Sequence, residues 1–417
     1  MSKTEMPSIR FYGFDNDWEQ RKFDEAFIER RNKTEKENED ILLSCAINGM
    51  FLNSELFGHF RGTTTIGYLR VKKNDLILSA QNLHLGNANV NLRFEHGIIS
   101  PAYKVYDLNN CNPEFVQSWV KRDDTKKFFL AATTEGASQC RKNIEWETLG
   151  KQTISMPSLD EQKRIGSFFS QLDNLITLHQ RKFEKLTNVK KSMLEKMFPR
   201  NGSCYPEIRF KGFTDPWEQR KFGEVFMSLQ NNTLSRAELN DEIGAAQNIH
   251  YGDVLIKYDE ILDVSKEPLS YIEKQSIADK FKTSYLQNGD VIIADTAEDE
   301  TVGKCTEIEG LTDQKVISGL HTMPVRPNRK FAFGFLGFYL NSAAYHDQLK
   351  PLMQGIKVTS ISKGAMQDTV VKFPLDLKEQ EQIGIYFGGL DHLITLHQCE
   401  LEKLQSIKKS LLEKMFV

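Results

Sequence analysis

The stretch LDEQKRIGSFFSQLDNLITLHQRKFEKLTNVKKSMLEKMF at residues 159–198 returns as LKEQEQIGIYFGGLDHLITLHQCELEKLQSIKKSLLEKMF at residues 377–416, with 25 identities in 40 positions. In both copies, apolar residues recur every seven positions with another apolar residue four positions further on. This pattern predicts two amphipathic helices of roughly 35 residues, each about 50 Å long at ~1.5 Å per residue.

Neither helix can bury its apolar stripe alone, so the simplest prediction is that the two pack together as an antiparallel coiled coil with pseudo-twofold symmetry. Such a spacer would hold two globular heads apart. In the alternative, each helix packs only on its own domain. Two stripe positions carry histidine, which we expect to pack or pair rather than to bind metal. The predicted stripe comprises Ile165, Leu172, His179, Leu186 and Met193, and Ile383, Leu390, His397, Leu404 and Leu411.

A second repeat precedes each helix. PSIRFYGFDNDWEQRKFDEAF at residues 7–27 returns as PEIRFKGFTDPWEQRKFGEVF at residues 206–226, with 14 identities in 21 positions. The segments between the repeats, roughly 28–158 and 227–376, do not align with each other. We therefore expect two domains, each followed by a helix. The predicted boundaries are 1–158 for the first domain, 159–200 for its helix, 201–376 for the second domain and 377–417 for its helix.

The two variable segments read as mixed α+β domains. YLRVKKNDLILSA (68–80) and YLQNGDVIIADTAED (285–299) are typical of half-buried strands, whereas NPEFVQSWVKRD (112–123) and FAFGFLGFYLNSAAYHDQL (331–349) are typical of helices. Strands dominate both segments. The predicted fold class is α+β, with twisted and largely antiparallel sheets.

Composition sets further bounds. The chain has 417 residues, a net charge of −3, and no window resembling a membrane span or the apolar core of a signal peptide. A cytoplasmic location is the expectation. The six cysteines form no C-x-x-C pair, so we expect neither a zinc site nor a disulfide framework.

The sequence lacks recognisable catalytic motifs. NPEF at residues 112–115 approaches the Asn-Pro-Pro-Tyr/Phe element of adenine methyltransferases, but Glu114 replaces the second proline and no F-x-G-x-G loop stands upstream. Phosphate-loop, His-Glu-x-x-His and Gly-x-Ser-x-Gly patterns are missing. DTAEDE at residues 295–300 lacks the spacing of a calcium loop and favours a solvated turn. We expect no catalytic residue and no metal site, and two dissimilar heads on one repeated frame indicate a recognition protein.

The whole chain resembles one family. The order P-x-I-R-F-x-G-F-x-x-x-W-E-Q-R-K-F, variable domain, P-S-L-D-E-Q-K-R-I and Q-L-D-N-L-I-T-L-H-Q, followed by all of it again, is similar to the specificity subunit of type I restriction-modification systems. The resemblance implies two target recognition domains, each reading one half of a split, gapped site in double-stranded DNA. It also implies a helical spacer that docks two methyltransferase subunits, with translocase-endonuclease subunits joining to cut unmodified DNA. S-adenosylmethionine, ATP and Mg²⁺ would then bind the partner subunits and not this chain, and no membrane is involved.

Three polar stretches are the candidate DNA contacts. Two lie ahead of the long helices, at residues 133–144 and 353–364, where the family has a loop close to DNA, and the third is SAQNLHLGNANVNLR at residues 79–93. Amides suit adenine edges, and basic or hydroxyl groups suit bases and phosphates. Each residue could instead be an exposed polar loop residue. The candidates are Gln81, Asn82, His84, Asn87, Arg93, Ser138, Gln139, Arg141 and Lys142 in the first domain, and Lys357, Thr359, Ser360 and Lys363 in the second.

The repeated WEQRKF peptide is interpreted as frame or partner-docking structure, because a base-reading element should differ between two heads with different targets. Its key positions are Trp18, Arg21 and Phe23 in the first copy, and Trp217, Arg220 and Phe222 in the second.

The acidic charge of the second variable segment weighs against strong DNA binding by this chain alone. Residues 223–376 carry 22 acidic against 15 basic side chains, so DNA binding by the isolated chain should be weak and salt-dependent. Three alternatives stay open: a scaffold joining two protein-binding heads, the recognition subunit of another DNA modification system, and an enzyme such as a fused methyltransferase-nuclease.

Overall fold

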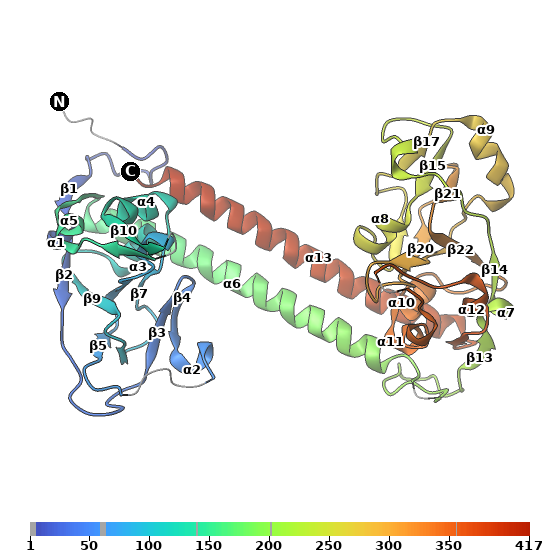
Figure 1. The fold of residues 1–417 in the computed structure, drawn as a ribbon, viewed down its shortest axis with the longest axis horizontal. Helices are drawn as coiled ribbons and strands as arrows, with labels where there is room; N and C mark the ends of the chain where they lie inside the picture. Colours follow the sequence, from blue (N-terminus) through green and yellow to red (C-terminus); the bar gives the residue numbers. More distant parts are fainter. Residues whose placement is uncertain (1–5, 59–63, 139–140, 201, 356) are drawn as a thin grey trace. The chain divides into compact units, whose positions relative to one another are not determined.

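The computed structural model describes residues 6–58, 64–138, 141–200, 202–355 and 357–417 (Figure 1). The chain divides into two compact units, which we call unit 1 (Met1–Arg181 with Gln398–Val417) and unit 2 (Lys182–His397). Each unit therefore contains one head, the start of one long helix and the end of the other. Head 1 denotes residues 6–158 and head 2 residues 202–376. The predicted α+β class is confirmed.

The long helices are α6 (Leu159–Lys196) and α13 (Leu377–Lys414), each of 38 residues, close to the expected length. In unit 1 the start of α6 packs on the end of α13, where Ile165 and Phe169 share one buried cluster with Phe416. In unit 2 the pairing is reciprocal, with Phe198 stacked on Phe387 at 5.8 Å between ring centroids. The helix ends therefore pair antiparallel within each unit, and the alternative in which each helix packs only on its own domain is wrong.

Eight of the ten predicted stripe residues lie in the buried clusters of the two units or pack against them. Ile165, Leu172, Ile383 and Leu390 are buried, and the other six positions are intermediate in exposure. One ion pair recurs beside the stripe, Lys408 with Asp173 in unit 1 and Lys190 with Asp391 in unit 2.

Head 1 is built on a four-stranded antiparallel sheet in the order β2-β9-β6-β7. Hairpin β3-β4 and ladder β5-β8 lie beside it, and β1 pairs with β12 at the junction with α6. The elements are β1 (Glu19–Lys22), α1 (Phe23–Ala26), β2 (Phe27–Arg30), β3 (Leu43–Ala46), β4 (Gly49–Leu52), α2 (Asn53–Leu56), β5 (Leu69–Lys72), β6 (Leu76–Ser79), η1 (Leu83–Leu85), β7 (Ala88–Val90), β8 (His96–Ile99), β9 (Tyr103–Leu108), α3 (Pro113–Val120), α4 (Asp123–Ala131), β10 (Thr133–Ser138), β11 (Arg141–Ile144), α5 (Trp146–Lys151) and β12 (Thr153–Met156).

Head 2 has a five-stranded sheet in the order β14-β22-β18-β20-β16 and a three-stranded sheet in the order β17-β15-β21. Its pairs are antiparallel except β16-β20 and β15-β21. The elements are β13 (Glu218–Lys221), α7 (Phe222–Val225), β14 (Phe226–Ser228), η2 (Arg236–Glu238), β15 (Ala246–Ile249), α8 (Tyr251–Ile256), β16 (Ile261–Asp263), β17 (Ser270–Ile272), α9 (Gln275–Ala278), η3 (Asp279–Ser284), β18 (Val291–Ala294), β19 (Thr296–Ala297), β20 (Cys305–Glu309), β21 (Val316–Ser318), β22 (Thr322–Pro327), α10 (Phe335–Asn341), α11 (Ala343–His346), η4 (Lys350–Leu352), β23 (Thr359–Ser360), α12 (Lys363–Gln367) and β24 (Val370–Phe373).

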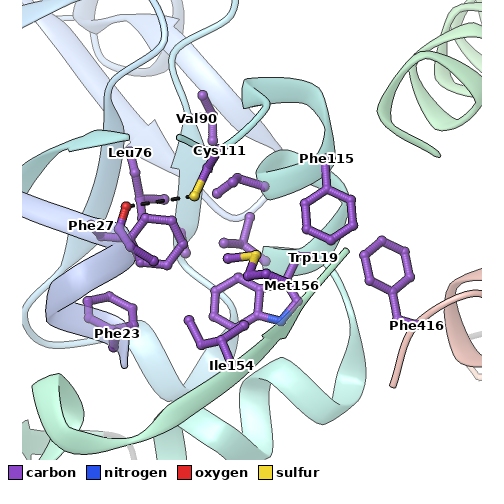
Figure 2. Close-up of a cluster of buried hydrophobic side chains, with 14 of the residues drawn as sticks. Phe23, Phe27, Leu76, Val90, Cys111, Phe115, Trp119, Ile154, Met156 and Phe416 are labelled. Carbon is purple, nitrogen blue, oxygen red and sulfur yellow. Dashed lines mark hydrogen bonds between the residues drawn. The ribbon is translucent and has the colours of Figure 1, made fainter. Parts of the chain in front are cut away.

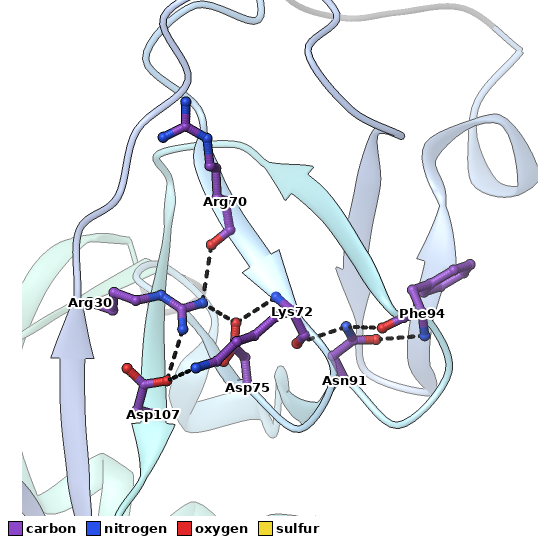
Figure 3. Close-up of polar contacts among 7 residues, drawn as sticks. All are labelled: Arg30, Arg70, Lys72, Asp75, Asn91, Phe94 and Asp107. Atoms are coloured by element: carbon purple, nitrogen blue, oxygen red, sulfur yellow. Dashed lines mark hydrogen bonds and ion pairs between the residues drawn. The ribbon is translucent and has the colours of Figure 1, made fainter.

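The two heads share one core topology although their sequences do not align. Strands β2-β9-β6-β7 of head 1 correspond to β14-β22-β18-β20 of head 2, all paired antiparallel. Each central strand follows a buried aspartate that accepts a hydrogen bond from the backbone three residues earlier, Asp75 from Lys72 and Asp290 from Gln287. Asp75 also pairs with Arg30 (Figure 3), and Asp290 pairs with Arg326.

The repeated E-Q-x-x-I-G stretch explains how each head joins its helix. Glu161 receives two hydrogen bonds from Arg10, whereas Gln162 Oε1 accepts from the backbone N–H of Asn112 at 2.8 Å, just ahead of α3. Gly166 permits this contact, because a Cβ there would lie 2.6 Å from Asn112 Oδ1 and from the amide nitrogen of Phe115.

The second copy repeats these contacts. Glu379 binds Arg209 through two hydrogen bonds, and Gln380 Oε1 accepts from the N–H of Ala332 at 2.9 Å, ahead of α10. A Cβ at Gly384 would lie 2.5 Å from the carbonyl oxygen of Phe333. The frame motifs are thus a pair of equivalent junctions, each fixing the segment before one helix of the head.

The WEQRKF aromatic side chains lie in the core of each junction. Trp18 packs edge-on against Phe416, which stacks on Phe115 at 5.2 Å; Figure 2 shows Phe416 entering this cluster beside Phe115. Trp217 packs likewise against Phe198. Every one of these contacts joins a head to the helix end contributed by the other repeat.

Candidate nucleic-acid interface

One end of the head 1 sheet carries the loop between β6 and β7. The backbone N–H of Ser79 donates to Asn87 O at 3.1 Å, closing the loop over residues 80–86. The turn before β9 joins it, because Ala80 N–H donates to Ala102 O at 3.1 Å. Gly86 ends the loop with φ of 88°, a left-handed conformation that glycine adopts freely.

Head 2 has the same loop at the same place. The N–H of Ala294 donates to Lys304 O at 2.9 Å, and Asp295 N–H donates to His321 O at 3.1 Å. Gly303 ends this loop with φ of 90°. Residues 295–303 are therefore the structural counterpart of the head 1 loop that carries Gln81 to His84.

The stretch ahead of each long helix meets this loop. In head 2, β23 pairs antiparallel with β19, placing Ser360 opposite Thr296, and Ile361 N–H donates to Asp295 O at 2.9 Å. In head 1 the corresponding stretch forms the β10-β11 hairpin. Its Lys142 is close enough to act on His84, whose pKa is lowered by burial and then by the Lys142 charge. In head 1 two stretches selected separately from the sequence thus meet, and in head 2 the selected stretch meets the equivalent loop.

The candidate DNA-contacting residues of head 1 differ in their exposure and in their partners. Gln81 is exposed in the loop, whereas Asn82 and His84 are half-buried there. Asn87 is buried, and its Oδ1 accepts a hydrogen bond from Cys45 Sγ at 3.4 Å. Its side chain therefore contacts the interior of the head and is not placed to contact DNA. Arg93 lies outside the loop, where it pairs with Glu55 at 2.6 Å. On the hairpin, Ser138 ends β10, and Arg141 and Lys142 begin β11, whereas Gln139 lies outside the described residues.

The head 2 candidates line β23 and its flanks. Lys357 and Ser360 are exposed and Thr359 is half-buried on β23. Lys363 is exposed as the first residue of α12, which Ser362 caps by accepting from the N–H of Ala365. These side chains offer cationic and hydroxyl groups of the kind that contact phosphates and base edges.

Sequence reasoning missed the DTAEDE loop of head 2 as a counterpart of the head 1 loop. Glu298, Asp299 and Glu300 are exposed, as a solvated turn requires. Hydrogen bonds from Thr301 lower the pKa of Asp299. The sequence did contain a signal for this equivalence. In both heads an Asn-Asp or Gly-Asp pair precedes an apolar strand, and the loop after that strand ends in glycine.

The frame aromatic residues lie in the interior beneath these loops, in the same buried clusters as Leu83 of head 1 and Ala297 of head 2. Trp18, Phe23, Trp217 and Phe222 are buried. Arg21 donates to the carbonyl oxygens of Glu25 and Asn109, whereas Arg220 is exposed and pairs with Glu218.

Within residues 6–58, 64–138, 141–200, 202–355 and 357–417, no cluster of three or more His, Cys, Asp or Glu side chains could hold a metal ion. Over the same described part of the chain, no helix is long and apolar enough to cross a membrane.

Comparison with known proteins defines the family. The family model described as the type I restriction modification DNA specificity domain matches residues 2–188 and again residues 214–406. The chain belongs to this family and carries its domain twice.

Two curated relatives come from Methanocaldococcus jannaschii. The type I restriction enzyme MjaVIII specificity subunit is 23% identical over 364 residues, covering 82% of this chain and 78% of the relative. The putative type I restriction enzyme MjaX specificity subunit is 22% identical over 379 residues, covering 87% and 77%.

Solved structures share the fold. The S subunit of a type I restriction-modification system from M. genitalium aligns with a TM-score of 0.58 at 12% identity, covering 99% of each chain. A chain from a structure describing complex assembly and conformational transition of a type I system aligns with a TM-score of 0.50 at 15% identity, covering 97% of this chain and 99% of that one. At these identities the likeness concerns the fold.

Proposed function

We propose that this chain is the sequence-specific DNA-recognition subunit of a type I restriction-modification complex, in which each head reads one half of a split, gapped site. The observation that carries the proposal is the contrast between the two heads. Their sheets share one topology and their junctions are nearly identical, yet the loops at the same end of each sheet differ in length and chemistry. Two heads that recognise different DNA sequences need the same supporting sheet and junction but different loops at the DNA.

The loops offer suitable groups for DNA. Gln81 and Asn82 can hydrogen-bond to adenine edges in the major groove, and Lys142, Lys357 and Lys363 can contact phosphates. The excess of acidic over basic residues in head 2 means that few phosphate contacts come from that head. Partner subunits would supply the rest of the phosphate contacts, and affinity of the isolated chain would be low.

The spacer helices offer two equivalent docking positions. In unit 1, α6 exposes Leu175 and Leu178 at 46% and 45%, and in unit 2, α13 exposes Leu393 and Leu396 at 42% and 46%. These residues belong to the identical stretch LDxLITLHQ. Apolar side chains exposed at the same place in both copies suit two identical partners. We assign these pairs to the docking of two methyltransferase subunits.

Catalysis belongs to the partners in this account. S-adenosylmethionine would bind the methyltransferase subunits, and ATP and Mg²⁺ the translocase-endonuclease subunits, with assembly in the cytoplasm. This chain contributes base recognition and geometry.

The proposal is tested by purifying the chain with its methyltransferase subunit and measuring protection of sequence-diverse duplexes. Protection of a bipartite motif, with steep salt dependence, is expected. Equal binding to all duplexes, or none, would favour a scaffold with two protein-binding heads. As a docking test, Leu175→Glu combined with Leu393→Glu should reduce the methyltransferase bound per chain, whereas the surface control Asn174→Lys should leave it unchanged.

A further inference from the structure

An aromatic cluster lies in head 2 at the carboxyl ends of the parallel strands β15 and β21. Ile249, the last residue of β15, is opposite Ser318, the last residue of β21. The chain leaves these ends through His250 and Tyr251 on one side and through the turn to His321 on the other. The Tyr251 ring is 4.6 Å from that of His250 and 5.3 Å edge-on from that of His321. His250 is buried, whereas His321 is 47% exposed at its side chain.

His321 has an unusual backbone. Its φ is 54°, in the left-handed region that few residues other than glycine occupy, with asparagine, aspartate and histidine the commonest of them. The hydrogen bond from Asp295 N–H to His321 O holds the turn in place. The chain thus presents an imidazole at a positive-φ position, where glycine has the least strain, and residues in such sparsely populated conformations cluster at functional sites.

The imidazole lies at the meeting point of the interface segments. Its Nδ1 is 3.4 Å from Thr296 Oγ1 and 3.4 Å from Asp295 Oδ1, in the loop equivalent to the Gln81 loop of head 1. Thr296 is in turn opposite Ser360 on β23. The equivalent of His321 in head 1 is Ala102, as the matching hydrogen bonds from Ala80 and Asp295 show. His321 therefore adds a polar side chain to one head only.

The hydrogen-bond geometry favours one tautomer of the ring. Thr296 Oγ1 donates to Asp295 Oδ1 at 2.7 Å, so the hydroxyl oxygen accepts from Nδ1–H of His321. With the proton on Nδ1, the Nε2 atom of a neutral imidazole carries a lone pair. No hydrogen bond to Nε2 forms among the residues that the structure describes. This acceptor is available to a ligand.

We propose that His321 is a specificity-determining residue of head 2, whose Nε2 accepts a hydrogen bond from an exocyclic amino group in the major groove, the N6 amine of adenine or the N4 amine of cytosine. The proposal rests on the proposed DNA-recognition function and names one residue that separates the two heads. Thr296 acts as a positioning residue by setting the tautomer.

The test uses the chain in complex with its methyltransferase subunit and a randomised duplex library, comparing wild type with His321→Gly and His321→Asn. Both replacements suit the left-handed conformation, so thermal unfolding should be unchanged or shifted upward. We expect His321→Gly to lose selectivity at one base pair of one half-site by about tenfold, within the usual cost of a mismatch. The other half-site should stay intact. His96→Ala, which removes an exposed imidazole from head 1, is the matched control and should not alter the half-site affected by His321→Gly.

The outcomes separate this inference from the function on which it rests. A folded His321→Gly complex that selects the wild-type motif with wild-type affinity overturns the role of His321 and leaves the function standing. A wild-type complex that selects no motif overturns both.

Discussion

The guanidinium of Arg10 donates two hydrogen bonds to the carboxylate of Glu161, at 2.7 and 2.8 Å, and the pair is nearly inaccessible to solvent. Arg10 lies near the start of the frame, and Glu161 lies in the first turn of α6, 151 positions later. Arg209 and Glu379 form the same pair with the same two distances. Each pair fastens the start of a head to the start of the helix that follows it.

Breaking the first pair should destabilise unit 1. Arg10→Ala leaves the Glu161 carboxylate buried without its cation, which typically costs about 3–5 kcal/mol. Denaturant unfolding followed by hydrogen exchange should show loss of protection confined to unit 1, and Arg209→Ala should show the same in unit 2. Arg31→Ala, which removes an exposed pair with Glu29, should leave unfolding nearly unchanged. Wild-type stability in Arg10→Ala would contradict the role of the junction.

The glycines of the E-Q-x-x-I-G stretch should tolerate no side chain. Gly166→Ala places a Cβ 2.6 Å from Asn112 Oδ1 and from the amide nitrogen of Phe115, at the start of α3, and forcing such an overlap costs about 1–3 kcal/mol. Gly388→Ala is the matched control, because α13 has open space there, and helix propensity should stabilise that variant by up to ~1 kcal/mol. Thermal unfolding of the two variants should therefore shift in opposite directions. A shift in the same direction would refute the close-contact explanation.

Trp18→Ala should weaken assembly without altering which sequence is read. The side chain is 6% exposed in the cluster containing Phe416, so its truncation should cost about 3–5 kcal/mol. The same applies to Trp217→Ala in unit 2. Stability is measured by thermal unfolding, and the motif by selection from random duplexes with whatever complex still assembles. An altered motif would show that WEQRKF takes part in reading.

Unit 2 should lose stability as pH rises towards neutrality because of Glu307. Burial raises the pKa of Glu307 to about 7 from its usual 4.5, against the opposing backbone N–H donors of Gly337 and Gly334. The folded state then holds a proton that the unfolded chain releases, so this contribution is complete below pH 4.5 and fades up to pH 7, by up to about 3 kcal/mol.

Glu307→Gln removes that titration. Its denaturation midpoint should fall less than that of the wild type between pH 5 and 7.5, whereas the exposed replacement Glu298→Gln should follow the wild type. Parallel pH profiles for wild type and Glu307→Gln would contradict the assignment.

The frame was predictable from sequence and the loop equivalence was not. The long helices, their pairing stripe and the two α+β heads follow from repeats and periodicity, because both are local patterns. The correspondence between residues 80–86 and 295–303 depends on strand register, which pairs Leu76 with Tyr106 and Val291 with Val325. Register is a long-range property that no local window of sequence contains. The sequence therefore indicated only a turn at DTAEDE and gave no reason to select His321.

The antiparallel pairing was predicted from the sequence, but the contacts that it creates between the two repeats were not. Linear boundaries at 158 and 376 separate heads from helices, whereas the compact units each combine parts of both helices. Phe198 and Phe416 each close an identical LEKMF stretch that follows a long helix. Because the helices pair antiparallel, Phe416 packs into head 1 and Phe198 into head 2.

The central claim is that this chain reads a split DNA site, and methylation-aware sequencing tests it most directly. DNA from cells carrying this chain with its methyltransferase subunit should show one bipartite motif, with two specified half-sites around unread base pairs and one modified adenine on each strand. A continuous motif, or no modification dependent on the chain, would contradict the account.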